Sequence, residues 1–387
     1  MAVERLSLPS GAILDLEVHE SPEDLPGVVG HWGEKKTMDD IHQALALQGV
    51  RQIELSTSTG FDYIYHQRAG IERHDAIQDE LSVAETIATT TLELNGWKPT
   101  DVDAVFVGSG VPPVDNPNVG VNYANIVAQQ LGMREDVMTH STYAACTSGA
   151  HEFFRALTNP DLQGKKVLIL GMENVTTLTP DLDINRADPF SIQVFSNGAA
   201  GIGIVPGEDI IAHTVKRKVF KDTEGALAAH MTYERLLDPE NADIWQEDDE
   251  NGLHLIRYPK PQDGLLLVLD NRKTSMLFVG EMVVFIGEVL KEHNQQFPSK
   301  NIIYTAAHPA SKAMSDGLVK RLVRAGVESP PIPWVVPDGN SSAATTLIAH
   351  NRLLPEAKGG RRIMVVGYGA GGSADGGIIE YGLRKAA

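Results

Sequence analysis

Hydrophobic positions along the chain fall into two alternating patterns. Short runs in which nearly every position is apolar predict buried strands that end in turns, and the clearest are 102–110, 165–174 and 199–207. Longer segments with apolar positions three and four apart predict helices, and one of these covers residues 82–96 with Gly96 as its end. Strands that alternate with helices in this way indicate an α/β protein with mixed or parallel sheets.

The second half of the chain repeats the pattern of the first. Four segments recur in the same order and at similar spacing: 301–309 matches 102–110, 339–354 matches 145–157, 361–369 matches 165–173, and 375–382 matches 199–207. Chance likeness of buried strands explains one or two such matches, but four in order favour a duplicated unit. We therefore predict two related halves, 1–206 and 207–387, with Cys146 and Asn340 at equivalent helix starts that face each other.

Composition is that of a large globular protein. The 387 residues are 42% hydrophobic, enough for an extensive core, and no segment is of low complexity. We find no run of about 18 apolar residues and no basic N-terminal segment followed by an apolar one, so we expect a soluble cytoplasmic protein without a membrane span. One cysteine and no H-E-x-x-H helix give no metal signature, and we expect neither a metal nor a tightly bound cofactor.

The charge distribution limits the possible partners. A formal net charge of −18 opposes binding to nucleic acid, whose phosphates would be repelled. Two basic islands interrupt the acidic chain, and each is either a solvated face or a dock for an anionic partner or a phosphate-bearing cofactor. The islands are Lys216, Arg217, Lys218 and Lys221, and then Lys320, Arg321 and Arg324.

The single cysteine is the first candidate for chemistry. Cys146 lies at the start of a predicted helix of small residues, where the helix dipole and unpaired N–H groups favour a thiolate and hence a nucleophile. The alternative is a small buried hydrophobic residue. A histidine partner is expected, and His308 is the best candidate because it directly follows an apolar strand; His140 is the second candidate.

Two further features accompany the Cys and His candidates. Asn340 either caps a helix or acts as a neutral donor that polarises a carbonyl group or holds an enolate. The glycine-dense turn at 367–377 could bring a backbone N–H close to a reacting oxygen. This turn matches neither the G-x-G-x-x-G unit nor the P-loop pattern, so we exclude nucleotide binding of those kinds.

Five short motifs carry a resemblance to a known family. They are AACTSGA around Cys146, AAHPAS around His308, GNSSAA around Asn340, QRAGIERH at 67–74 and FSNGAAGIGIV at 195–205. In this order, and with the terminal glycine loop, they resemble the β-ketoacyl-acyl carrier protein synthase III group of the thiolase superfamily. The similarity extends from about residue 54 to the end of the chain.

This resemblance implies a fold and a mechanism. It implies a five-layered αβαβα fold of two duplicated halves that works as a homodimer in fatty acid biosynthesis. Cys146 would be acylated by an acyl-CoA or an acyl carrier protein, with coenzyme A thioester as substrate and no bound cofactor. His308 and Asn340 would stabilise the enolate formed when malonyl-acyl carrier protein loses carbon dioxide, and the N–H groups of Cys146 and Gly371 would form the oxyanion hole.

The same resemblance implies the binding contacts. Arg68 would lie near the nucleotide end of coenzyme A, and Tyr63 or Tyr65 would stand where the family has a stacking tryptophan. Lys320 and Arg321 would belong to a basic patch for docking of the carrier protein.

Several departures from the family pattern predict an altered substrate. Pro309 to Ser311 and Ala313 replace expected residues after the histidine, and the glycine loop lacks both of the family's aromatics. The segment 230–264 is an insertion with three aromatic residues, and the stretch before residue 54 resembles an extension. An acyltransferase or a condensing enzyme of secondary metabolism with the same acyl-cysteine intermediate, and a cysteine thioesterase or hydrolase, therefore remain as alternatives.

Overall fold

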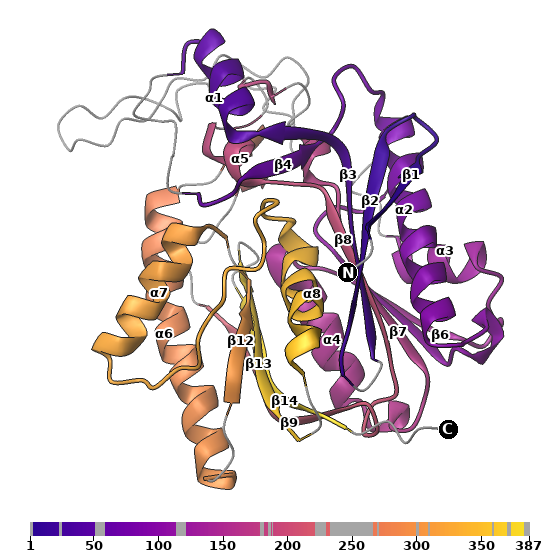
Figure 1. Ribbon diagram of the computed structural model, residues 1–387, viewed down its shortest axis with the longest axis vertical. Coiled ribbons are helices and arrows are strands. Elements are labelled where there is room, and N and C mark those ends of the chain that lie inside the picture. Colours follow the sequence, from indigo (N-terminus) through magenta and orange to yellow (C-terminus); the bar gives the residue numbers. More distant parts are fainter. Residues whose placement is uncertain are drawn as a thin grey trace.

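The protein is built from five alternating layers of helices and sheets (Figure 1). The computed structural model describes residues 3–22, 25–50, 59–113, 121–178, 182–184, 187, 189–220, 230–232, 266–268, 271–298, 302–308, 310–357, 360–369 and 373–382. Everything below concerns these residues. The inserted segment 230–264 lies outside them, apart from the short strand at its start.

The first sheet is formed by the N-terminal part of the chain. Its strands run in the order β1-β2-β3-β8-β7-β5-β6, and β4 pairs with the end of β3. Strands β7, β5 and β6 are parallel, whereas β3 and β8 are antiparallel to their neighbours. The bounds are β1 (Val3–Ser7), β2 (Ile13–Glu20), β3 (Pro26–Thr37), β4 (Tyr63–His66), β5 (Ala104–Ser109), β6 (Met138–Tyr143), β7 (Val167–Glu173) and β8 (Gly198–Ile204).

The second sheet is formed by the C-terminal part and repeats the first. Its order is β12-β13-β14-β9, with β12 and β13 parallel and the other pairs antiparallel. The strands are β9 (Ile210–Val219), β12 (Ile302–Ala307), β13 (Arg362–Gly369) and β14 (Ser373–Tyr381). Strands β10 (His230–Thr232) and β11 (Leu266–Val268) form a separate two-stranded antiparallel sheet. Strands β3, β8, β7 and β5 have the same order and directions as β9, β14, β13 and β12, which confirms the predicted duplication.

Helices cover both outer faces and fill the space between the sheets. Helices α2 (Arg73–Leu94) and α3 (Tyr123–Gln130) pack on the first sheet, and α6 (Asn271–Gln296) and α7 (Lys312–Arg324) on the second. Helices α4 (Ser148–Thr158) and α8 (Ser342–Leu353) lie between the sheets and contact both. A smaller lobe contains α1 (Met38–Leu47) and α5 (Pro189–Val194). The described residues also form short 3-10 helices, which are η2 (Pro99–Asp101), η3 (Ala145–Thr147), η4 (Pro160–Leu162), η5 (Val175–Leu178) and η8 (Leu354–Glu356).

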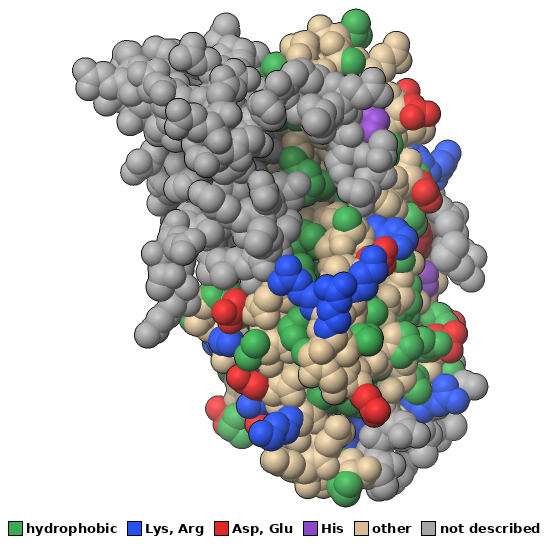
Figure 2. Space-filling view, turned by 90° about the vertical axis from the view of Figure 1, so that its left-hand side faces the viewer, with side chains coloured by type: hydrophobic (Ala, Val, Ile, Leu, Met, Phe, Trp, Pro, Cys, Tyr) green, Lys and Arg blue, Asp and Glu red, His purple; other side chains and the backbone are tan. Residues whose placement is uncertain are grey.

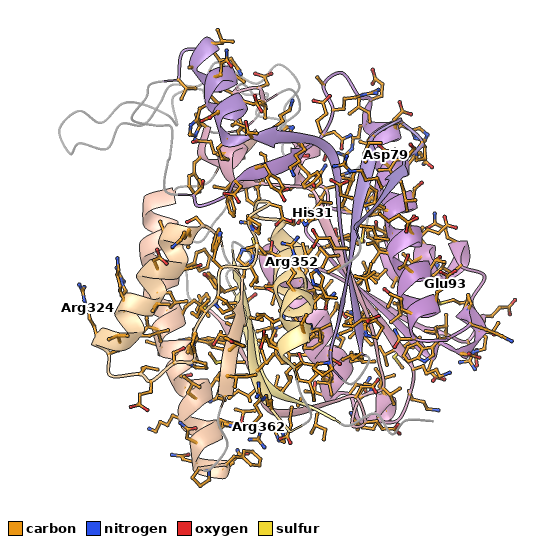
Figure 3. The ribbon with its side chains drawn as sticks, viewed as in Figure 1. His31, Asp79, Glu93, Arg324, Arg352 and Arg362 are labelled. Atoms are coloured by element: carbon orange, nitrogen blue, oxygen red, sulfur yellow. The ribbon has the colours of Figure 1, made fainter. Side chains whose placement is uncertain are left out.

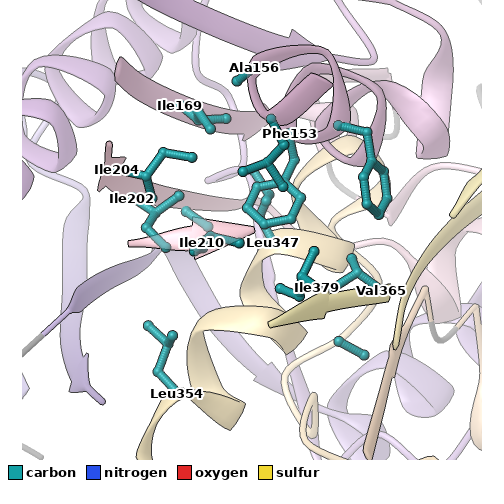
Figure 4. Close-up of a cluster of buried hydrophobic side chains, with 14 of the residues drawn as sticks. Phe153, Ala156, Ile169, Ile202, Ile204, Ile210, Leu347, Leu354, Val365 and Ile379 are labelled. Atoms are coloured by element: carbon teal, nitrogen blue, oxygen red, sulfur yellow. The ribbon is translucent and has the colours of Figure 1, made fainter. Parts of the chain in front are cut away.

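The main hydrophobic core lies around the two central helices. Phe153 and Ala156 of α4 and Leu347 of α8 meet side chains of both sheets there, such as Ile202 and Val365 (Figure 4). Small residues let the helices touch: a Cβ at Gly149 would overlap the carbonyl oxygen of Ala343. This close contact at the two helix starts explains why the sequence uses small residues there.

One expectation about the N-terminus is wrong. Strand β3, at 26–37, was expected to lie in an extension, but it pairs with β8 as β9 pairs with β14 and is therefore part of the duplicated unit. Only β1 and β2 are additional strands at this edge. The sequence did not reveal β3 because its alternation is broken by glycine and by buried polar residues such as His31.

Candidate active site

Cys146 lies in the middle of the molecule, in the turn η3 that leads directly into α4. Its side chain is only 6% exposed. The preceding residue, Ala145, has φ +48°, a left-handed conformation that costs a non-glycine residue about 1–2 kcal/mol. Gly369, at the end of β13, packs so tightly against the cysteine that a Cβ there would overlap the Cys146 Cβ and lie 2.9 Å from Sγ. The sulfur is thus held where η3, α4 and β13 meet.

The start of α8, just after Asn340, approaches Cys146 from the other half of the chain. The Oγ atom of Ser342, the first residue of α8, lies 3.5 Å from the Cys146 sulfur. Oδ1 of Asn340 accepts hydrogen bonds from the Ser342 N–H at 2.8 Å and the Thr345 hydroxyl at 3.1 Å. Because both bonds end on Oδ1, the amide Nδ2 remains as a donor, and it has no acceptor among the described residues. The backbone of Asn340 is fixed by an isolated bridge to Phe195.

His308 directly follows β12, and its N–H donates to the carbonyl oxygen of Val366 in β13 at 2.9 Å. Its ring is buried and packs edge-on against Tyr368, with the ring centroids 5.5 Å apart. Tyr368 precedes Gly369, and its pKa is raised by burial and further by Cys146. This ring therefore links His308 to the neighbourhood of the cysteine.

The imidazole of His308 is neutral at pH 7. Burial lowers the pKa of His308 to about 3, and Nδ1 has no hydrogen-bond partner within the described part of the chain. A neutral ring can donate one N–H to a developing oxyanion, but with so low a pKa it is a weak proton acceptor.

Asp338 anchors the loop that carries Asn340. Its buried carboxylate accepts hydrogen bonds from Arg352 at 2.8 and 2.5 Å and lies 2.7 Å from His31 Nε2. Burial raises the pKa of Asp338, but the attraction of His31 and Arg352 lowers it well below its usual range. Figure 3 shows His31 and Arg352 side by side between the first sheet and α8. This ion cluster ties the loop of the second half to a strand of the first.

Two buried glutamates lie at the end of β7 and beside it. Glu173 ends β7, and its Oε2 accepts the N–H of Ala343 at 3.2 Å. Glu80, on α2, accepts a hydrogen bond from Asn174 at 3.3 Å. Burial raises the pKa of Glu80 to about 8, with Glu173 adding to the effect, and burial raises the pKa of Glu173 to about 7.

Three residues of the candidate site were not predicted from the sequence. Ser342 stood only among the small residues of a buried helix, Asp338 was part of a turn, and Glu173 was the end of an apolar strand. A detectable signal existed for Glu173, because a carboxylate that ends a run such as VLILGME lies at the sheet edge where sites form. Nothing in the sequence indicated that Ser342 faces the sulfur.

The remaining predicted site residues are Gly371, Arg68 and one of Tyr63 and Tyr65. Gly371 lies outside the described residues. Arg68 is exposed in the turn after β4, with its guanidinium beside Gly11. Tyr65 is buried and donates its hydroxyl to Asp15 at 2.6 Å, which leaves the half-buried Tyr63 as the more accessible of the two rings.

The two basic islands differ in their environment. In the first, two lysines of β9 form ion pairs with glutamates of α6: Lys216 with Glu292 at 2.8 Å, and Lys218 with Glu281 at 3.0 Å. The charges of these lysines are therefore balanced by α6. Lys221 lies outside the described residues. This island is therefore a face of intramolecular ion pairs.

The second island is a basic surface on α7. Lys320, Arg321 and Arg324 are exposed there, together with the apolar Val319 and Val323. Figure 2, which faces this side of the molecule, shows Lys and Arg side chains gathered across the middle of the view among hydrophobic ones. Such a mixed surface is suited to an acidic partner.

His140, the second histidine candidate, lies within β6 and not at its end. Its Nδ1 lies 3.0 Å from Oε1 of the fully buried Glu152. The His140 ring therefore faces the Glu152 carboxylate of α4, and we assign His140 a structural role. Among the described residues, no group of three side chains could hold a metal ion, and no helix is long and apolar enough to cross a membrane.

Comparison with known sequences finds relatives of one kind. No family model matches the chain. A β-ketoacyl-acyl carrier protein synthase III of Chelativorans sp. is 22% identical over 334 residues, 84% of this chain and 92% of that protein. One from Allorhizobium ampelinum is 28% identical over 191 residues, 47% of this chain and 51% of that protein.

Comparison with solved structures shows the fold. A 3-oxoacyl-(acyl-carrier-protein) synthase III has a TM-score of 0.66 at 17% identity and covers 98% of this chain and 100% of its own. The priming β-ketosynthase of the R1128 polyketide pathway has a TM-score of 0.65 at 19% identity, and the match covers 95% of this chain and 97% of that one. The 1,3,6,8-tetrahydroxynaphthalene synthase of Streptomyces coelicolor A3(2) has a TM-score of 0.63 at 15% identity, and the match covers 95% of this chain and 98% of that one. Over most of its length the chain is therefore similar to β-ketoacyl-acyl carrier protein synthase III enzymes, and it has the same fold as the solved members of that group.

Proposed function

We propose that the protein is a condensing enzyme that carries its acyl substrate on Cys146. In the first step the thiolate attacks the carbonyl carbon of an acyl thioester, the carbon–sulfur bond of the donor breaks, and an acyl-cysteine forms. In the second step malonyl-acyl carrier protein loses carbon dioxide, and the resulting enolate carbon attacks the acyl-cysteine and releases the Cys146 sulfur. The observation that carries this proposal is the placement of Cys146 at a helix start, in contact with Ser342, whose N–H is bonded to the Asn340 side chain.

His308 and Asn340 are assigned to the second step. The Asn340 amide and the neutral His308 ring offer hydrogen-bond donors in a buried place, where a donor stabilises a developing oxyanion far better than it does in water. Neither group needs to change charge to do so, since burial keeps the pKa of His308 at about 3. The backbone N–H groups of Cys146 and Gly371 are assigned to the thioester oxygen.

Coenzyme A and acyl carrier protein are the proposed partners. The exposed Lys320 and Arg321 on α7 favour docking of an acidic carrier protein, and Arg68 is assigned to the nucleotide end of coenzyme A. We also propose a homodimer in the cytoplasm. Strand β6 is the last strand of the first sheet, with Met138 42% exposed, and such an edge is a natural surface for pairing with a second copy.

Two other reactions use the same acyl-cysteine. Transfer of the acyl group to another acceptor, or condensation in secondary metabolism, is favoured by the departures from the family pattern after His308 and in the glycine loop. The polyketide enzymes among the structural neighbours share this fold. A cysteine hydrolase is the alternative of another class, and it would release free acid without a malonyl donor.

The test begins with acylation. The protein is incubated with a panel of acyl-CoAs of different chain length, and the intact mass is measured with Cys146→Ala as the control. A mass increase that disappears in the variant supports the proposal, and no adduct with any donor contradicts it. Products formed with and without malonyl-acyl carrier protein then distinguish condensation, transfer and hydrolysis.

A further inference from the structure

Glu173 is a fully buried carboxyl group that contacts the start of α8. It lies at the end of β7, and its Oε2 accepts the Ala343 N–H. The Ser342 side chain and the backbone N–H groups of Asn174 and Gly110 also interact with this carboxyl and lower its pKa. The carboxyl is therefore a polar group in an apolar interior that is connected to the start of α8.

The Ser342 hydroxyl lies between Glu173 and Cys146. Its Oγ is 3.5 Å from the sulfur, and the same side chain also interacts with the Glu173 carboxyl and lowers its pKa. Ser342 is held in this place by its N–H bond to Asn340, with φ +36°, a strained conformation for a residue other than glycine. The strain therefore directs one hydroxyl group toward both the sulfur and the carboxyl.

Burial raises the pKa of the Glu173 carboxyl to near neutral pH. The charge of Glu173 in turn adds to the raised pKa of Glu80 on α2, which also interacts with Tyr123 and Arg73. Burial and the Glu80 charge also raise the pKa of Tyr143, to about 12. The carboxyl of Glu173, with its pKa raised to about 7, can thus exchange a proton near pH 7, which His308 with a pKa of about 3 cannot do.

We propose that Ser342 and Glu173 form a proton relay that removes the thiol proton of Cys146. The Sγ–H bond breaks, the Ser342 hydroxyl takes this proton as it passes its own to Glu173, and a neutral carboxylic acid and a thiolate result. When the thiolate attacks an acyl thioester, the leaving thiolate takes up the proton. Ser342 touches the reacting sulfur, whereas Glu173 is a positioning residue that acts through it.

This inference rests on the proposed function only for the identity of the acyl donor. Its test uses no acyl donor. Because Cys146 is the only cysteine of the chain, iodoacetamide reports its reactivity without interference. The alkylation rate is measured by intact mass from pH 5.5 to 9.5 for the wild type, Glu173→Gln and Ser342→Ala. Glu152→Gln is the matched control, because Glu152 is equally buried but pairs with His140 instead.

The relay predicts a step in the wild-type profile near pH 7, where Glu173 becomes a proton acceptor. Both relay variants should lose this step and alkylate at least about tenfold more slowly at pH 7.5, while the control keeps it. If Glu173 acted only as a nearby negative charge, Glu173→Gln would alkylate faster, and that result overturns the relay. A wild-type profile that coincides with that of Glu173→Gln overturns it as well.

Two further measurements separate this inference from folding defects and from the proposed function. Urea unfolding of each variant shows whether the fold is retained, and a slow variant with wild-type stability supports the relay. Ser342→Thr keeps the hydroxyl and should restore the step. If no acyl-CoA acylates the protein but the step is present and lost as described, the proposed function fails while the relay stands.

Discussion

The hydroxyl oxygen of Ser342 lies 3.5 Å from the sulfur of Cys146, although 196 residues separate them in the chain. Each of the two residues lies at the start of a central helix, and each of these helices belongs to a different half of the duplicated fold. The candidate site therefore exists only where the two halves meet. Substitutions on either side of this contact should affect different parts of the reaction.

Replacing Asn340 with alanine should separate the two partial reactions. Self-acylation needs the sulfur and should stay within about threefold of wild type, whereas condensation should fall by about 10²–10³, the usual cost of one lost oxyanion donor. Single-turnover acylation and steady-state condensation with malonyl-acyl carrier protein measure the two rates. Equal loss in both would contradict the role given to the Asn340 amide.

Gly369→Ala should displace the cysteine. The new Cβ would overlap the Cys146 Cβ, and because the contact is between buried atoms we expect a loss of about 1–3 kcal/mol in unfolding free energy and slower alkylation of the thiol. Gly317→Ala is the matched control, since Gly317 lies in α7 with open space around it and should gain up to about 1 kcal/mol. Urea unfolding measures the change in unfolding free energy for both variants. Similar changes in the two would show that the packing at Gly369 is unimportant.

Removing the charge of Asp338 should weaken both the fold and the site. Asp338→Asn leaves Arg352 and His31 short of a buried anion, so we expect about 3 kcal/mol of destabilisation and a fall in condensation as the Asn340 loop shifts. Asp316→Asn removes an exposed partner of Lys312 and should cost under about 1 kcal/mol. Denaturant melts test the difference, and equal costs for the two variants would refute it.

Three buried histidines should make stability fall in mild acid. Burial lowers the pKa of His66 and His350 to about 4 and of His308 to about 3, so below pH 6.5 the unfolded state binds protons that the folded state does not. Glu80 and Glu173 act in the opposite direction, because their raised pKa values keep protons on the folded state above pH 4.5.

The histidine contribution can be isolated with one variant. His350→Gln should remove up to about 1.4 kcal/mol per pH unit from the slope of the unfolding free energy between pH 6.5 and 4.5. Urea unfolding at pH 6.5, 5.5 and 4.5 measures this slope for both proteins. An unchanged slope would show that His350 takes up its proton in the folded state.

Reversing charge on α7 should affect only the step that needs a carrier protein. The double change Lys320→Glu with Arg321→Glu should raise KM for malonyl-acyl carrier protein by about tenfold, because charge complementarity governs the encounter rate. Acylation by an acyl-CoA should be unchanged. Lys98→Glu, an exposed lysine on the first half, is the control, and the same rise in KM for both proteins would argue against docking at α7.

The sequence predicted the fold well where apolar runs were continuous. The pairs β5 with β12, β7 with β13 and β8 with β14 were expected because their segments recur in the same order, and β5, β7 and β13 are fully buried and mostly apolar. Strand β3 was missed because glycines and His31 interrupt its pattern. Helix α7 begins at Lys312, and the Ser311 hydroxyl caps it by accepting the N–H of Met314.

The site was predictable only in part. Cys146, His308 and Asn340 follow recognisable local patterns, and the structure places Cys146 and Asn340 at two facing helix starts. Ser342 and Glu173 could not be inferred together, since their contact depends on how closely α8 approaches the end of β7. Distances of this kind arise from packing between elements and leave no periodic trace in the chain.

Helix α8 has a consequence for how the protein is made. Its Asn351 side chain donates to the carbonyl oxygens of Val28 and Gly201 at 3.1 and 3.0 Å, so a late segment completes the inner face of the earliest sheet. A nascent chain that has reached only residue 340 leaves the ribosome with that apolar face uncovered. We expect it to bind holdase chaperones until helix α8 emerges, and then to fold as one cooperative unit.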